Sequence, residues 1–340
     1  MKVKAIAFTA PGVAEYVDRE FEIPSHGNWV LVHKYVSTIS CGTERANLMG
    51  HPNVAGGHKV DMATYFPRYL GYSSAGVIEQ VGADVTDFKV GDRVALSWGI
   101  HTEYDIYDPR NVTKIPDNVS FEDAALCHIT TFPMGGIRKT NLEFGESAMT
   151  VGLGILGQMS VMYQKLAGAY PVIAADPNPE RREFALKNGA DFAFDPTAPD
   201  FAAQVKAITG GGAKVGIEVT GIGAGLDGIL DCMAPFGRVA LLGCTRDKEF
   251  TIDYYRKVHG PGITLIGAHT AARPKEESHG GWWTQKDDVQ ALIKLHEFGR
   301  LRLGELVEEI HPPAEAPEVY NRLAREKSFP VVQFDWEALK

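Results

Sequence analysis

A glycine-rich turn near the middle of the chain is the feature that most constrains its fold. The sequence TVGLGILG at residues 150–157 follows an apolar run and precedes a stretch compatible with a helix. Gly152 permits a tight turn after a strand, Gly154 lets the backbone approach a pyrophosphate, and Gly157 lets the next helix pack closely on the sheet. The helix N-terminus would face phosphates with free N–H groups and partial positive charge. The pattern predicts a dinucleotide-binding βαβ unit.

An acidic residue follows at the spacing that this unit requires. Asp176 lies 19 residues after Gly157 and closes the apolar run 172–175. A carboxylate at the end of the second strand can accept hydrogen bonds from an adenosine ribose, and it would repel a 2′-phosphate. Asp176 therefore favours NAD over NADP. A glycine-rich turn in some other βαβ protein remains the alternative.

The second half of the chain alternates short apolar runs with helix-like segments. This regular alternation is typical of a parallel sheet covered by helices on both faces, a doubly wound α/β domain. The expected strands are 148–151, 172–175, 192–194, 215–219, 238–242 and 264–266, and the expected helices include 179–188, 201–208 and 224–233.

The first 120 residues show a different pattern. Apolar and polar residues alternate in 29–36, 75–81 and 93–96, with glycine turns at 82–84 and 91–92 between them. This alternation predicts an antiparallel β domain. The tail adds an expected helix at 286–299 and strands at 306–310 and 330–334, which we expect to return to the β domain.

Composition limits the kinds of partner and compartment. The 340 residues carry a net charge of −9, which disfavours nucleic acid and anionic membrane as partners. The N-terminal segment lacks the apolar core of a signal peptide, and no run could span a bilayer, so we expect a cytoplasmic protein. No CxxC pair joins the four cysteines, which argues against a disulfide framework, and Cys232 and Cys244 are expected to be small core residues.

Motifs along nearly the whole chain resemble the medium-chain dehydrogenase/reductase superfamily of zinc-type alcohol dehydrogenases. They are ISCGTE at 39–44, LGYSSAGV at 70–77, VG at 81–82 and GDRV at 91–94, followed by the glycine turn. The resemblance implies a GroES-like catalytic domain at 1–122, completed by 273–340, and a Rossmann NAD-binding domain at 123–272. It also implies a homodimer or homotetramer.

The same resemblance assigns residues to the cofactor. A basic residue at position 181 often touches the adenosine ribose or phosphate, and residues after the fourth, fifth and sixth strands flank the nicotinamide. The expected cofactor-binding residues are Gly152, Gly154, Ile155, Leu156, Gly157, Asp176, Arg181, Thr220, Leu242, Gly243 and Gly267.

A departure from the family concerns its catalytic zinc. Cys41 and Cys127 match two cysteine ligands, but Tyr72 stands where the family has its histidine ligand, and the structural zinc lobe is missing. Because a catalytic zinc needs three protein ligands, a site would require another group, either His101 or His128. We state the ligand set Cys41, Cys127 and His101 as a hypothesis.

The alternative is chemistry without zinc. A histidine would then act as the base, since its pKa lies near the working pH, while Thr43 relays the proton as in the family. Tyr72 could hydrogen-bond the substrate oxygen in place of the metal. The candidate catalytic residues are Cys41, Thr43, Tyr72, His101 and His128.

These observations predict an NAD(H)-dependent oxidoreductase acting on a small-molecule secondary alcohol or ketone. A polyol, sugar or related polar substrate is expected, because the branch resemblance and the polar residues His101, His128 and Arg45 favour it. The alternatives are a zinc-free quinone or enone reductase and a noncatalytic NAD-binding protein descended from a dehydrogenase.

Overall fold

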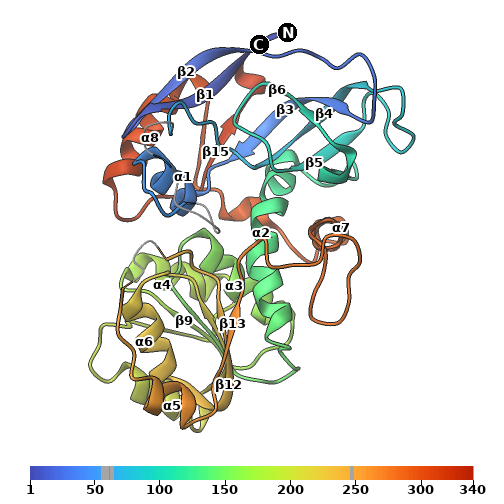
Figure 1. Ribbon diagram of the computed structural model, residues 1–340. Coiled ribbons are helices and arrows are strands. Elements are labelled where there is room, and N and C mark those ends of the chain that lie inside the picture. The colour runs from blue at the N-terminus through green and yellow to red at the C-terminus, as the bar shows by residue number, and fades with distance from the viewer. Residues whose placement is uncertain (55–60, 62–64, 246–248, 340) are drawn as a thin grey trace. The chain divides into compact units, whose positions relative to one another are not determined.

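The computed structural model describes residues 1–54, 61, 65–245 and 249–339, which form two compact units (Figure 1). Unit 1 comprises Met1–Ile129 and Gln285–Lys340, and unit 2 comprises Thr130–Thr284. The expected limits at 122/123 and 272/273 fall within helix α2 (Phe121–Lys139) and within unit 2. Among the described helices, none is both long and apolar enough to cross a membrane.

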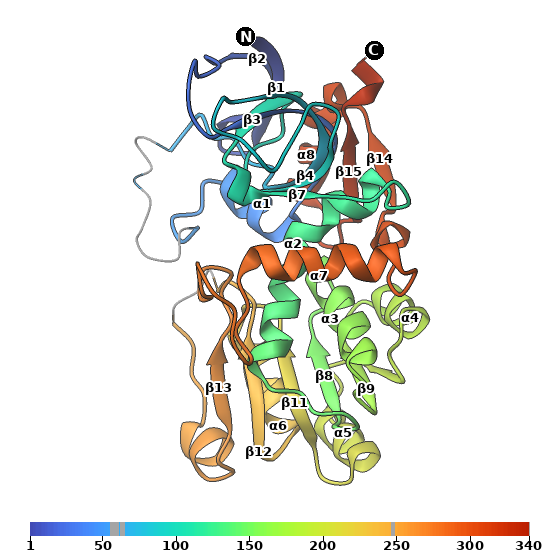
Figure 2. The same ribbon diagram turned by 90° about the vertical axis from the view of Figure 1, so that its right-hand side faces the viewer.

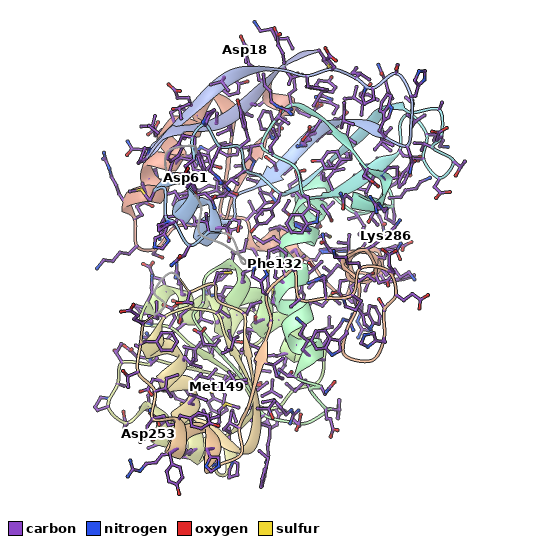
Figure 3. All side chains as sticks on the ribbon, in the orientation of Figure 1. Asp18, Asp61, Phe132, Met149, Asp253 and Lys286 are labelled. Atoms are coloured by element: carbon purple, nitrogen blue, oxygen red, sulfur yellow. The ribbon has the colours of Figure 1, made fainter. Side chains whose placement is uncertain are left out.

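Unit 2 is built on a parallel sheet, which confirms the predicted doubly wound domain. Within its described residues the strand order is β10-β9-β8-β11-β12-β13, and Figure 2 shows most of these strands side by side. Met149, labelled in Figure 3, belongs to the buried core between this sheet and its helices. The strands are β8 (Ala148–Val151), β9 (Val172–Ala175), β10 (Phe192–Phe194), β11 (Ala213–Glu218), β12 (Met233–Leu241) and β13 (Thr264–Gly267).

The helices of unit 2 lie close to their expected positions. Helix α6 (Gly223–Asp231) begins and ends earlier than expected. Strand β12 follows it and begins at Met233, before an irregular turn in which Phe236 has a φ of 62°. The alternation of apolar residues gave no sign of this early start. The helices are α3 (Ile155–Leu166), α4 (Pro179–Lys187), α5 (Phe201–Thr209) and α6 (Gly223–Asp231), with a π-helical turn, η3, at Tyr255–His259.

Unit 1 is the predicted β domain, in which nearly all pairings are antiparallel. Its larger sheet, within the described residues, has the order β14-β15-β3-β4-β5-β7, with β6 also paired to β3. Strands β1 and β2 form a separate hairpin. The strands are β1 (Lys2–Ala10), β2 (Val13–Glu20), β3 (Val30–Thr38), β4 (Ser73–Val81), β5 (Arg93–Ser97), β6 (Tyr104–Tyr107), β7 (Val112–Lys114), β14 (Glu309–His311) and β15 (Val332–Asp335).

The C-terminal tail returns to this sheet through β15, which pairs antiparallel with β3. The expected strand at 306–310 is displaced, because 303–306 forms a 3-10 turn and β14 begins at Glu309. Helix α8 (Ala316–Arg325) was not predicted from the sequence. Its apolar face packs into the core with Trp336 and Phe334. The helices of unit 1 are α1 (Cys41–Leu48), the first part of α2, α7 (Gln285–Glu297) and α8 (Ala316–Arg325), with 3-10 turns η2 (Pro109–Asn111), η4 (Leu303–Leu306), η5 (Pro313–Glu315) and η6 (Glu337–Leu339).

A fully buried lysine on β3 makes the stability of unit 1 depend on pH. Lys34 Nζ donates a hydrogen bond to the Ile100 carbonyl at 2.5 Å and lies 3.6 Å from an Asp105 carboxylate oxygen. Burial lowers the pKa of Lys34 to about 8 from 10.5, although Asp105 opposes the shift. Between these values the unfolded chain binds a proton that the folded chain does not, so the free energy of unfolding rises with pH.

We therefore expect Lys34→Met to flatten the pH dependence of stability. From pH 8 to 10.5 the unfolding free energy of the parent should rise by about 3 kcal/mol more than that of the variant. Urea unfolding followed by fluorescence at several pH values measures the difference, with the exposed Lys89→Met as the control. Parallel curves for the parent and Lys34→Met would contradict this account.

Candidate functional site

The glycine turn joins β8 to α3 in unit 2. Gly152 has a φ of +92°, a conformation that other residues rarely adopt, and a Cβ there would lie 2.8 Å from the Thr220 side chain. A Cβ on Gly157 would lie 1.8 Å from the Gly152 carbonyl oxygen, so the first turn of α3 rests directly on the loop. Apart from its two chain neighbours, no described residue has an atom within 4 Å of a Cβ on Gly154, the residue that precedes α3. The backbone at Gly154 is therefore open to a ligand.

Asp176, the residue after β9, ties this loop to the next helix. One carboxylate oxygen accepts a hydrogen bond from the backbone N–H of Leu153 at 2.8 Å, and the other accepts from Asn178 N–H at 2.8 Å. Arg181 lies 3.7 Å from the first oxygen. The structure thus brings together the predicted residues Asp176 and Arg181 beside the glycine loop. A carboxylate oxygen can accept more than one hydrogen bond, so these contacts leave capacity for a hydroxyl group.

The remaining predicted cofactor residues follow the carboxyl ends of neighbouring strands. Val151 pairs with Glu218, Glu218 with Leu241, and Leu241 with Gly267, so four strands end along one line. In doubly wound sheets this edge is where ligands bind. Thr220, Leu242, Gly243 and Gly267 all lie at this edge.

A buried carboxylate that the sequence analysis missed organises the edge. The Glu218 side chain accepts hydrogen bonds from Thr220 N–H at 2.7 Å, from the Thr220 hydroxyl and from Gly221 N–H at 3.2 Å. Its backbone carbonyl accepts from the N–H groups of Leu242 and Gly243, each at 2.9 Å. Burial raises the pKa of Glu218. The available signal was a single acidic residue ending an apolar strand.

A second polar cluster lies in unit 1, where three segments bring aromatic rings around a histidine. The His128 ring, on α2, lies 5.3 Å from the Tyr72 ring and 4.8 Å from the Trp98 ring, both nearly edge-on. The Tyr72 hydroxyl donates a hydrogen bond to Ser40 Oγ, just before α1. The Gln285 side-chain amide, at the start of α7, contacts His128 Nδ1. The structure therefore brings together Tyr72 and His128, two of the predicted catalytic residues.

Trp98 is held at this cluster by an unusual backbone turn. Its φ is +67°, a left-handed conformation that costs free energy in residues other than glycine. The next residue, Gly99, also has a positive φ, and a Cβ there would lie 2.2 Å from the Tyr107 hydroxyl oxygen. Trp98 is 40% exposed, whereas His128 is 1% exposed. The turn thus presents a partly exposed aromatic ring beside a buried imidazole.

His101 belongs to a different, fully buried network. Its Nδ1 lies 2.7 Å from Ser37 Oγ and its Nε2 lies 3.2 Å from a Glu44 carboxylate oxygen, which also accepts from the Tyr320 hydroxyl. The other Glu44 oxygen accepts from Ser40 N–H at 2.8 Å, ahead of α1. His101 therefore braces α1 against the sheet and α8, and its ring nitrogens are engaged there.

The expected zinc ligands do not fit a zinc ion. The Cys127 thiol points along its own helix to the Asp123 carbonyl at 3.6 Å, and burial together with Asp123 raises its pKa far above the usual range. Cys41 contacts the Pro330 carbonyl at 3.6 Å, and both His101 nitrogens are engaged. Within the part of the chain that the structure describes, no three His, Cys, Asp or Glu side chains form a group able to hold a metal.

Two further expectations concern α1. Thr43 lies on this helix, half-buried, and its carbonyl accepts a hydrogen bond from the Asn47 side chain at 2.8 Å. Arg45 donates to the carbonyls of Leu323 and Glu326, each at 2.7 Å, and so stabilises the end of α8. Arg45 thus has a structural role that the sequence analysis did not foresee.

Cys244, expected in the core, is exposed because it follows the end of β12, whereas Cys232 is buried as expected.

Two family models match the chain, one in each half. Residues 25–117 match the alcohol dehydrogenase GroES-like domain, and residues 156–280 match the zinc-binding dehydrogenase domain. D-guloside 3-dehydrogenase of Escherichia coli is 28% identical, over 94% of this chain and 95% of that protein. L-threonine 3-dehydrogenase of Thermococcus kodakarensis is 30% identical, over 74% of this chain and 78% of that protein.

Solved structures share the fold. The crystal structure of 2R,3R-butanediol dehydrogenase from Bacillus subtilis superposes with a TM-score of 0.81 at 23% identity, covering 98% of this chain and 99% of that chain. Two matched domains in the family's order, relatives along most of the length and a common fold agree with one another. The chain belongs to the medium-chain dehydrogenase/reductase superfamily, as an alcohol dehydrogenase-like oxidoreductase.

Proposed function

We propose that the protein is an NAD(H)-dependent oxidoreductase that interconverts a secondary alcohol and a ketone on a polyol, sugar or related polar molecule. The observation that carries this proposal is the strand edge of unit 2, where the open backbone at Gly154, the carboxylate of Asp176 and the loops held by Glu218 gather. The relatives named above are 3-dehydrogenases of a guloside and of threonine, which supports a polar substrate.

The nucleotide would bind through the groups that the edge presents. The N-terminus of α3 faces the pyrophosphate with free N–H groups, and Gly154 allows close approach. Asp176 accepts hydrogen bonds from the adenosine ribose, and its charge disfavours a 2′-phosphate. Thr220, Leu242, Gly243 and Gly267 flank the nicotinamide, which supplies or accepts the hydride when bound.

The proton would move through the hydroxyl groups of unit 1. Tyr72 donates its hydrogen bond to Ser40, so the Tyr72 oxygen can accept a proton from a substrate hydroxyl while its own proton passes to Ser40. His128 and Trp98 border the same tyrosine ring and would contact the substrate oxygen and carbon chain. This assignment uses Tyr72 and His128 and gives no metal-binding role to Cys41, Cys127 or His101. Thr43 remains a candidate relay on α1.

The first test is a turnover screen. We expect the protein to reduce NAD⁺ in the presence of at least one polyol or sugar, measured at 340 nm. Tyr72→Phe keeps the ring but removes the hydroxyl, so turnover should fall by about 100-fold while the Kd of NADH is unchanged. The exposed Tyr254→Phe serves as the control. Equal turnover for Tyr72→Phe and the parent would refute the relay, and turnover restricted to quinones or enones would refute the substrate class.

A second prediction concerns the choice of nucleotide. NADH should bind more tightly than NADPH. Asp176→Asn should weaken NADH binding by about tenfold and so reduce the ratio of the two Kd values, because a neutral amide replaces a charge-assisted acceptor. Fluorescence titration measures both Kd values. Asp191→Asn is the matched control, since Asp191 accepts a backbone hydrogen bond from Val172 at the opposite end of β9. A parent protein that prefers NADPH would overturn the assignment.

A third prediction concerns metal. If the cysteine thiols have only packing roles, Cys41→Ser and Cys127→Ser should leave the zinc content of protein purified without chelators unchanged. Elemental analysis of the parent and both variants, together with turnover after chelator treatment, measures this. One zinc per chain in the parent that is lost in both variants, together with turnover, would restore the zinc hypothesis.

A further inference from the structure

Gln285 is a side chain of unit 1 for which neither the fold nor the family resemblance supplies a role. It is the first residue of α7, next to Lys286, which Figure 3 labels. Its amide nitrogen approaches Nδ1 of His128, although 157 residues separate the two along the chain. The contact therefore joins the start of α7 to the middle of α2 at the ring bordered by Tyr72 and Trp98.

The chemistry of this contact determines where His128 carries its proton. A neutral imidazole has one nitrogen that donates and one that accepts, and the partner of one nitrogen selects the role of the other. The amide nitrogen of glutamine can only donate, so in the orientation that the structure shows, the amide donates and Nδ1 accepts. The proton of the neutral ring then lies on Nε2. In this tautomer, His128 can donate a hydrogen bond through Nε2 but cannot take a proton there.

We propose that Gln285 is a positioning residue that fixes His128 as the Nε2–H tautomer, so that His128 donates a hydrogen bond to the substrate oxygen and does not serve as the base. This inference rests on the proposed function, and it assigns a separate role to each group of the cluster. His128 stabilises negative charge on the oxygen through Nε2–H, and the Tyr72–Ser40 hydroxyl pair moves the proton.

The resulting reaction balances for alcohol oxidation. The C–H bond of the alcohol breaks, and its electron pair leaves with the hydrogen as hydride to NAD⁺. The substrate O–H bond breaks as the Tyr72 oxygen gains that proton, the Tyr72 proton passes to Ser40, and a Ser40 proton passes to water. His128 keeps its proton throughout and interacts most strongly when charge develops on the oxygen, which is how an oxyanion-stabilising donor accelerates a reaction. Ketone reduction follows the same steps in reverse.

The direct test is ¹⁵N NMR of protein labelled at histidine. The signals of a neutral ring distinguish a protonated Nε2 from a protonated Nδ1, and the expected result for His128 is protonated Nε2 in the parent. Gln285→Glu replaces the donor by an acceptor. At a pH high enough to keep the ring neutral, it should therefore move the proton to Nδ1 and shift one pair of signals, which also assigns them. A parent His128 protonated on Nδ1 overturns the inference.

Kinetics provide the second readout. Measured at a pH high enough to keep the ring neutral, Gln285→Glu should lower kcat at least tenfold with the Kd of NADH unchanged, because Nε2 would no longer donate to the oxygen. Gln285→Leu removes the donor without imposing the other tautomer, so its kcat should fall less. Gln290→Glu introduces the same charge on an exposed position of α7 and should leave kcat unchanged. Equal kcat for Gln285→Glu and the parent would also overturn the inference.

The two readouts separate this inference from the proposed function. Because the tautomer is measured in the protein without substrate, His128 can be found protonated on Nε2 even if no alcohol is oxidised. In that case the proposed function fails and the positioning by Gln285 stands. If the protein oxidises a polyol while His128 carries its proton on Nδ1, the proposed function stands and the positioning by Gln285 fails. Circular dichroism of each variant establishes that a lost activity is not lost folding.

Discussion

The contact between the first turn of α3 and the glycine loop fixes where this helix begins relative to the strand edge of unit 2. Because a Cβ at Gly157 would lie 1.8 Å from the Gly152 carbonyl oxygen, any larger residue would push the helix away from the loop. The helix N-terminus, the open backbone at Gly154 and the Leu153 N–H that binds Asp176 all move with that contact. A site that binds phosphate through backbone groups depends on such close packing, since a backbone cannot reach out as a side chain can.

The parts of the fold that depend on local pattern could be predicted. Strands β8, β9 and β10 have the expected residue ranges, because each is a short continuous apolar run between turns, and β8 and β9 are buried throughout. The early start of β12 could not, because Pro235 and Phe236 break the alternation and the pairing resumes at Arg238 only through a register shift. Helix α8 was not predicted, although its buried residues Val319, Tyr320 and Leu323 lie on one face, because a helix of 10 residues between two strand-like runs repeats the 3.6-residue period too few times to stand out.

Site residues were predictable when a motif fixes their role and unpredictable when a distant partner does. The glycine turn and Asp176 carry their spacing within one βαβ unit. The contact of Gln285 with His128 joins residues 157 positions apart, and no local pattern marks either as a pair. Cys127 shows the converse: its position along the chain matched a ligand position, but its thiol lies 3.6 Å from the Asp123 carbonyl of its own helix, and no group of three potential ligands forms in the described part of the chain.

The two histidines of unit 1 illustrate how environment decides function. His101 and His128 are equally buried, yet His101 faces the Glu44 carboxylate and Ser37, which hold both nitrogens in a network that braces α1. His128 faces an amide on one side and two aromatic rings, one of them partly exposed, on the other. The partners of the ring nitrogens, and not the extent of burial, therefore distinguish the bracing role of His101 from the donor role that we propose for His128.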